Sequence, residues 1–151
     1  MDLTVIKELA AKNNGLVLNE NISWGKLTTL GVGSMANTVV EVGRESSLCE
    51  LLTTCDAHNI PVFILGWGSN IAGADNSTST IYIKFSSGQL SDIKIGPELI
   101  SAGAGASNKK LVKSALDSGF GGITPLAYIP GTIGGSLRMN AGAHGCTISD
   151  Y

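Results

Sequence analysis

The residues best suited to chemistry lie in a short glycine-containing loop at positions 66–70. The loop reads Gly-Trp-Gly-Ser-Asn and directly follows an apolar run at positions 62–65. Glycines at 66 and 68 let the backbone turn and present successive N–H groups, a concave arrangement that binds anions. Ser69 and Asn70 add short polar side chains. Glycine and asparagine also favour a plain turn, so this loop alone is compatible with either interpretation.

A second candidate segment spans positions 128–145 and is rich in glycine. Pro130 and Gly131 predict a tight turn, and Thr132 predicts the N-cap of a short helix whose first amides point at a ligand. Gly134 and Gly135 inside that helix would each cost about 1 kcal/mol relative to alanine, which a close backbone approach would justify. Because positions 119–145 carry few charges, backbone amides and the helix dipole would hold a phosphate there. The alternative is a glycine-rich connection packed tightly on a sheet.

A third loop, at positions 31–36, fits the pattern Gly-x-Gly-x-x-Ala of dinucleotide-binding proteins. That pattern requires a helix directly after the glycines, so that its N-terminus receives the pyrophosphate. A β-forming run follows instead at positions 38–42, which disfavours a Rossmann domain. The sequence contains no P-loop, no Gly-x-Ser-x-Gly turn and no His-Glu-x-x-His motif. It therefore offers phosphate-binding loops without a self-contained catalytic set.

Composition limits the function classes. The chain of 151 residues is 43% hydrophobic and 15% charged with a net charge of -2, which excludes disorder and disfavours a basic nucleic-acid binder. No apolar run approaches the roughly 18–20 residues that span a bilayer, and the N-terminus shows no secretory signal. Three cysteines and two histidines lack metal-site spacing. We therefore expect a cytoplasmic protein with no metal, no membrane and no nucleic-acid partner.

The elements that must position these loops follow from hydrophobic spacing. A helix is expected from the apolar spacing at positions 5, 6, 9 and 10, ending near positions 13–15. A second is expected from about position 46 with Ser47 and Glu50 as its capping box. The β-forming run at 38–42, this second helix and a buried strand at 62–65 predict a right-handed strand–helix–strand crossover.

Further strands are expected at positions 80–85, 90–95 and 98–102, and a helix capped by Ser107 and stopped by Gly119. The pattern predicts an α+β fold with two small sheet-bearing lobes, at residues 1–75 and 76–151. The boundary is expected within positions 73–79.

Four motifs, taken in order, carry a resemblance to a known family. Positions 28–33 read Thr-Thr-Leu-Gly-Val-Gly, 65–70 read Leu-Gly-Trp-Gly-Ser-Asn, 129–135 read Ile-Pro-Gly-Thr-Ile-Gly-Gly, and 139–145 read Met-Asn-Ala-Gly-Ala-His-Gly. Together they resemble the UDP-N-acetylenolpyruvoylglucosamine reductase (UDP-N-acetylmuramate dehydrogenase) family. That family is built on the vanillyl-alcohol-oxidase type of FAD domain, so the resemblance implies two lobes with FAD between them.

The resemblance also implies a set of cofactor-binding residues. In the first lobe they are Gly66, Gly68, Ser69 and Asn70, which would face the FAD pyrophosphate, together with Trp67, which would shield the flavin or pack outside the loop. In the second lobe they are Ile129, Pro130, Gly131, Thr132, Gly134, Gly135, Asn140, Ala141 and Gly142. Trp67, Tyr128 and His144 depart from the residues usual in the family.

The implied activity is an FAD-dependent oxidoreductase in which NADPH reduces UDP-N-acetylglucosamine enolpyruvate to UDP-N-acetylmuramate, a cytoplasmic step of peptidoglycan precursor synthesis. The family's catalytic residues are expected beyond Tyr151, together with the substrate domain, so the chain is expected to bind FAD without turning over substrate alone. Two alternatives remain. One is an FAD-dependent sugar or alcohol oxidase, for which His144 and Cys146 match no recognised flavin-linkage motif. The other is a non-catalytic flavin-fold module.

Overall fold

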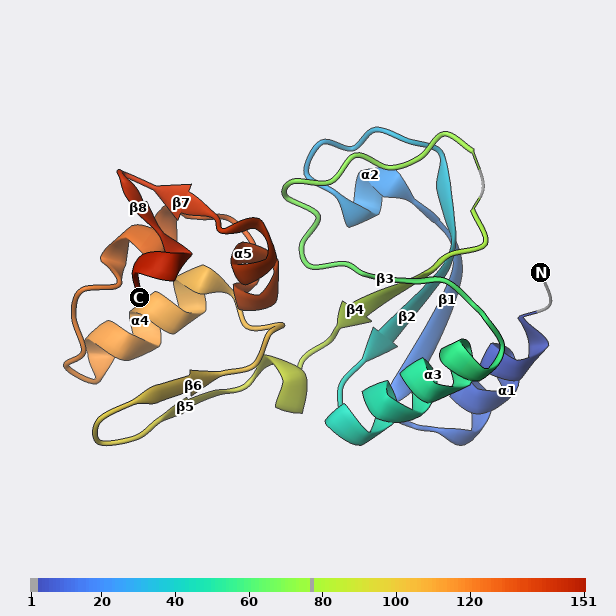
Figure 1. The fold of residues 1–151 in the computed structure, drawn as a ribbon, viewed down its shortest axis with the longest axis horizontal. Helices are drawn as coiled ribbons and strands as arrows, with labels where there is room; N and C mark the ends of the chain where they lie inside the picture. The colour runs from blue at the N-terminus through green and yellow to red at the C-terminus, as the bar shows by residue number, and fades with distance from the viewer. Residues whose placement is uncertain (1–2, 77) are drawn as a thin grey trace.

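The computed structural model describes residues 3–76 and 78–151, which form two lobes (Figure 1). The first lobe is built on a four-stranded sheet with the strand order β1-β2-β4-β3. β1 is antiparallel to β2, whereas β2, β4 and β3 run parallel. The strands are β1 (Leu16–Ser23), β2 (Met35–Val42), β3 (Val62–Ile64) and β4 (Ile81–Phe85), and the helices are α1 (Thr4–Lys12), α2 (Trp24–Leu27) and α3 (Glu45–Ala57).

Helices cover both faces of this sheet. Successive residues of a strand point to opposite sides, so each strand contributes to both packed faces. One face packs against α1 and α3 in a buried cluster that includes Val40 and Leu51. The other packs against α2 in a cluster that includes Val39, Tyr82 and Trp24. The Trp24 and Tyr82 rings meet edge to face with their centroids 4.8 Å apart. The sheet is therefore packed on both faces and carries the loops that leave its strands.

The predicted strand–helix–strand unit is present as β2, α3 and β3, both strands running parallel to the β4 that lies between them. The same pairing corrects the expectation that the strand near 80–85 belongs to the second lobe. β4 completes the first sheet, and the chain passes to the second lobe after Phe85 rather than within 73–79.

Two local predictions for the first lobe are wrong. α3 begins after Arg44, and Ser47 does not cap it: the Ser47 hydroxyl donates to Asn13 Oδ1 at 2.9 Å, while the Asn13 amide donates to Glu50 at 2.6 Å. The predicted buried strand at 62–65 forms, but its three residues in β3 are 39%, 42% and 51% exposed because β3 is an edge strand. Both errors arise from partners distant in sequence.

The second lobe surrounds α4 (Asn108–Asp117), whose predicted N-cap Ser107 is confirmed by a hydrogen bond that its hydroxyl accepts from Lys110 N–H. Gly119 follows the helix with a φ of +83°, as expected of a helix stop. The other elements are η1 (Gln89–Ser91), β5 (Ile93–Ile95), β6 (Ile100–Ala102), η2 (Thr124–Tyr128), α5 (Ile133–Met139), β7 (Gly142–Ala143), β8 (Cys146–Thr147) and η3 (Ile148–Asp150). Within 90–95, only the last three residues form the expected strand.

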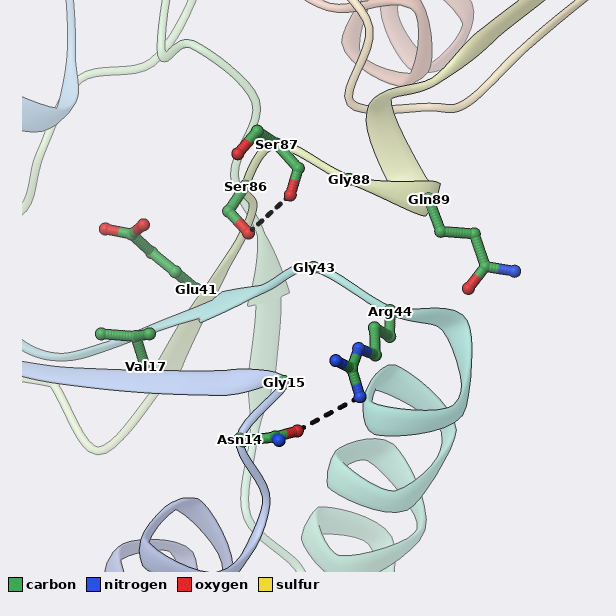
Figure 2. A pocket seen from close by; sticks show the side chains of 10 residues that line it. All are labelled: Asn14, Gly15, Val17, Glu41, Gly43, Arg44, Ser86, Ser87, Gly88 and Gln89. Atoms are coloured by element: carbon green, nitrogen blue, oxygen red, sulfur yellow. Dashed lines mark hydrogen bonds between the residues drawn. The ribbon is translucent and has the colours of Figure 1, made fainter.

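The passage between the lobes is tied to the first sheet where β2 and β4 end (Figure 2). Gln89 of η1 accepts a hydrogen bond on its side-chain oxygen from Glu45 N–H at 3.2 Å, so the second lobe supplies a cap for α3. Gly88 has a φ of +123°, and a Cβ there would lie 2.9 Å from the Gly43 carbonyl oxygen. The adjoining surface pocket contains none of the predicted site residues.

Among the described residues, no helix is both long and apolar enough to cross a membrane. Within the same residues, no group of three or more His, Cys, Asp or Glu side chains could hold a metal ion.

Candidate functional site

The loop at 66–70 is held in place by a neighbouring loop at 28–34. Thr29 N–H donates to the Gly68 carbonyl at 3.1 Å, Gly73 N–H donates to Val32 at 3.2 Å, and Ser34 N–H donates to Ala74 at 3.1 Å. These bonds join the two loops on the side of the sheet that carries α2. The glycines of the Gly-x-Gly-x-x-Ala pattern therefore serve packing between loops, and β2 follows them in place of the helix that a Rossmann domain requires.

Gly68 is fixed by two independent constraints. Its φ of +70° lies in the left-handed region, which residues with a Cβ rarely adopt. A Cβ at this position would also collide with the Leu27 carbonyl oxygen and lie 2.8 Å from Thr28 Cα. The glycine is thus required for this loop to approach α2.

The backbone N–H groups of the loop are available to a ligand. Leu65 N–H donates to Ile83 and Gly73 N–H donates to Val32, but none of the N–H groups at 66–70 donates a hydrogen bond within the described part of the chain. Five consecutive donors are therefore unpaired, two of them on glycines without side-chain bulk, and unpaired backbone amides of this kind can bind an oxyanion. Unpaired amides in this loop are compatible with a phosphate-containing cofactor, and the cofactor role of residues 66–70 stays a prediction.

The second lobe brings its own predicted loop against this one. A Cβ on Gly66 would lie 2.8 Å from Thr132 Oγ1, and one on Gly131 would lie 3.7 Å from Ser69 Oγ. The N–H groups of Gly131 and Thr132 also donate no hydrogen bond within residues 3–76 and 78–151. The loop at 66–70 of the first lobe and the turn after Pro130 of the second lobe therefore lie next to each other.

The start of α5 differs from its prediction in one respect. Thr132 is the N-cap, as expected, and accepts a hydrogen bond from Gly135 N–H at 3.2 Å. The next amides do not point at a ligand: Ile133 N–H donates to Ala106 at 2.9 Å and Gly134 N–H donates to Ala104 at 2.8 Å. The glycine at 134 permits close packing, since a Cβ there would lie 2.9 Å from the Ala104 Cβ.

Asn108 at the start of α4 holds the turn in position. It is fully buried, and its side-chain amide donates to the Ile129 carbonyl at 2.9 Å and to Ser136 Oγ at 2.7 Å. Its backbone N–H donates to the Gly131 carbonyl at 3.2 Å. Its Oδ1 is buried without a hydrogen-bond partner. Sequence reasoning missed Asn108, because an asparagine next to an N-cap carries no local sign of these contacts.

The remaining predicted residues make their contacts inside the second lobe. Asn140 ends α5 in the left-handed conformation, and its Oδ1 accepts from Ser149 N–H at 3.3 Å. Ala141 packs on the core around Val112, and Gly142 pairs with Thr147 between β7 and β8. A cofactor role for Asn140, Ala141 and Gly142 stays a prediction.

A pocket opens where the lobes meet. Trp67 lines it from the first lobe, and α4 and residues 127–131 line it from the second. Its second-lobe wall includes three lysines, Lys109, Lys110 and Lys113. These lysines had no signal in the sequence, because they lie about 20 residues from the glycine segment along the chain.

The chain matches a family model and several named proteins. The model of a family described as "FAD binding domain" matches residues 36–151. The chain is 39% identical over 133 residues to the UDP-N-acetylenolpyruvoylglucosamine reductase of Beijerinckia indica, covering 88% of this chain and 42% of that protein. It is 32% identical over 146 residues to the same-named protein of Bacillus velezensis, covering 97% of this chain and 48% of that protein.

A solved structure is also similar. The crystal structure of UDP-N-acetylenolpyruvylglucosamine reductase from Thermus caldophilus matches with a TM-score of 0.68 and 27% identity, over 89% of this chain and 46% of that one. The predicted α+β architecture of a vanillyl-alcohol-oxidase type FAD domain is confirmed by this match. The chain spans about half the length of the relatives it matches.

Proposed function

Because this chain belongs to the FAD binding domain family, we propose that it binds FAD as part of an NADPH-dependent reductase acting on UDP-N-acetylglucosamine enolpyruvate. The names of its relatives support the reductase, and the pairing of two loops across the lobes supports the cofactor site. FAD is the cofactor of the family.

The observation that carries this proposal is the set of unpaired backbone amides at 66–70, in a loop that lies close to the one carrying the unpaired amides of Gly131 and Thr132. Two phosphates joined through one oxygen offer acceptors on both sides, and donors from two loops can bind them together. The left-handed backbone at Gly68 lets the first loop pack closely against Leu27 and Thr28. The residues present therefore fit a dinucleotide pyrophosphate.

When bound, FAD supplies hydride transfer, here from NADPH toward the enolpyruvyl double bond. The chain's own part is to hold the pyrophosphate and orient the cofactor between the lobes. We assign no catalytic residue among residues 1–151, and we place the reaction in cytoplasmic peptidoglycan precursor synthesis, with the UDP-sugar as a partner of the longer enzyme.

The test is an FAD titration of the purified chain, followed by the visible spectrum and by quenching of flavin fluorescence. We expect saturable binding of one FAD, and at least tenfold weaker binding of riboflavin, which lacks the pyrophosphate. Equal affinity for FAD and riboflavin, or no binding of FAD, would overturn the proposal.

A second arm addresses turnover. With bound FAD, NADPH and UDP-N-acetylglucosamine enolpyruvate, the chain alone should show no steady-state oxidation of NADPH that depends on substrate. Multiple turnovers by this chain would contradict the assignment of no catalytic residue to it.

A further inference from the structure

The edge strand β3 presents backbone hydrogen-bonding groups to the outside of the first sheet. On its inner side it pairs in parallel with β4, where Ile81 N–H donates to the Pro61 carbonyl at 2.9 Å and Leu65 N–H donates to Ile83 at 2.8 Å. Alternate residues of a strand direct their backbone groups to opposite sides. The N–H and C=O groups at positions 62 and 64 therefore point outward, and the described residues provide them with no backbone partner.

The side chains of this strand are apolar and exposed at all three positions. Val62 is 39%, Phe63 42% and Ile64 51% exposed, and β3 contains no charged residue. A charge or an interruption is the usual protection of an edge strand against pairing with another chain. The opposite edge, β1, has both: Glu20 forms an ion pair with α1, and Asn21 has a left-handed φ of +55°. Of the two edges, β3 alone is open to a further strand.

The outward groups of β3 are complementary to those of a second copy of the same strand. In an antiparallel pair centred on Phe63, Val62 lies opposite Ile64 of the second copy, and Ile64 lies opposite Val62. Each of these two pairs exchanges two hydrogen bonds, which satisfies every outward N–H and C=O of the strand. Phe63 lies opposite itself at a position without hydrogen bonds, where side chains approach most closely and aromatic pairs are favourable. No like charges oppose each other in this register.

We propose that β3 is an interface at which two copies of this chain associate, and that the two four-stranded sheets become one continuous sheet across it. The two-fold axis passes between the two Phe63 residues, so both copies use the same surface. The contact is short, because β3 has three residues, and it falls among the small interfaces that give weak, reversible complexes. We expect a dissociation constant of about 10–100 μM. The proposal goes beyond FAD binding and does not depend on it.

The first test is sedimentation equilibrium of the whole chain over a concentration range of about 5–500 μM. The average mass should rise from 15.5 kDa toward twice that value as concentration increases. Ile64→Lys should weaken association at least tenfold, because it places an ammonium group in an apolar contact.

Val17→Lys is the matched control. Val17 is 55% exposed on the other edge strand, β1, so the variant makes the same change in net charge on the same sheet. Its association should stay within twofold of wild type. Phe63 is left unchanged in every variant, because its ring contacts Tyr82 with the centroids 6.2 Å apart.

A charge pair tests the register and separates a lost contact from a damaged fold. Val62→Glu and Ile64→Lys should each associate poorly alone. Mixed together, they place Glu against Lys at one pair and leave the native valine and isoleucine at the other. The mixture should therefore associate at least tenfold more strongly than either variant alone, and the gain should shrink at 0.5 M NaCl, where screening is strong. Misfolded variants would not rescue each other.

A constant mass of 15.5 kDa over the whole range, equal behaviour of Ile64→Lys and Val17→Lys, or no gain in the mixture would overturn the inference. A chain that stays monomeric and instead binds an extended apolar peptide at β3 would assign this edge to another polypeptide, and would overturn it too. None of these results bears on FAD binding, which the flavin titration tests separately.

Discussion

Gly68 is the single residue that most directly determines the conformation of the loop at 66–70. A Cβ would be placed in a left-handed conformation and driven against the Leu27 carbonyl. We expect Gly68→Ala to lower the free energy of unfolding by about 1–3 kcal/mol and to weaken FAD binding at least tenfold, because the loop must move to relieve the collision. Urea unfolding followed by the emission of buried Trp24, with FAD titration, measures both effects.

Gly121→Ala is the matched control. Its Cβ would meet nothing within 4 Å, so its stability should stay within about 0.5 kcal/mol of wild type and its FAD affinity should be unchanged. Equal behaviour of the two variants would show that Gly68 is not required.

Residue type was enough to predict the helix caps, because a cap depends only on residues close to it in the sequence. Ser107 and Thr132 cap their helices as expected, because a cap bonds to an amide three residues away. Ser47 failed as a cap because Asn13, 34 residues earlier, takes its hydroxyl. Asn108 and the pocket lysines were missed because their significance arises from partners that only the folded chain brings near.

Among the elements, α4 has the clearest positioning role, through Asn108. Asn108→Ala would leave the Ile129 carbonyl and the Ser136 hydroxyl buried without this donor, and we expect a loss of about 1–3 kcal/mol in stability. FAD affinity should fall as well, because the turn at Gly131 is no longer tied to α4. Chemical denaturation and FAD titration test the two effects separately.

Asn108→Asp sharpens this test through pH. At pH 7 its carboxylate would face the Ile129 carbonyl oxygen, an acceptor against an acceptor, so this variant should be less stable than Asn108→Ala. Burial favours the protonated acid, so the pKa of the new carboxyl should be raised and stability should recover as pH falls toward 4, where the acid can donate. As a control, Asp117→Ala removes only an exposed ion pair worth less than about 1 kcal/mol. A flat pH profile for Asn108→Asp would contradict the donor role.

The order of helices and strands was largely predictable from hydrophobic period, and the pairing of strands was not. Periodicity located α1, α3 and α4. It missed β1, in which four of eight residues are polar and whose pairing with β2 is set by tertiary contacts, and it assigned β4 to the wrong lobe. Which strand lies at a sheet edge is likewise a property of the assembled sheet, so the exposure of β3 had no local signal.

At the scale of the whole molecule, the two lobes have separate cores of unequal size. The first sheet has buried clusters of nine and six residues on its two faces, whereas the second lobe has one of four, namely Val112, Leu126, Ile129 and Ile148. Smaller buried clusters open at lower free energy, so the second lobe should open first. Hydrogen exchange without FAD should show faster exchange in α4 than in β2, and equal protection would contradict this order.

A cofactor held by both lobes should couple them. A ligand that binds only the closed arrangement stabilises it by RT ln(1 + [FAD]/Kd), about 2.7 kcal/mol when FAD is at 100 times its Kd. FAD should therefore slow exchange in α4 by up to about a hundredfold, since opening of the second lobe removes the donors of Gly131 and Thr132 from the site. Gly68→Ala should lose this protection at the same FAD concentration, whereas Gly121→Ala should keep it. If bound FAD protected β2 and left α4 unchanged, the second lobe would not hold the cofactor and the site would belong to the first lobe alone.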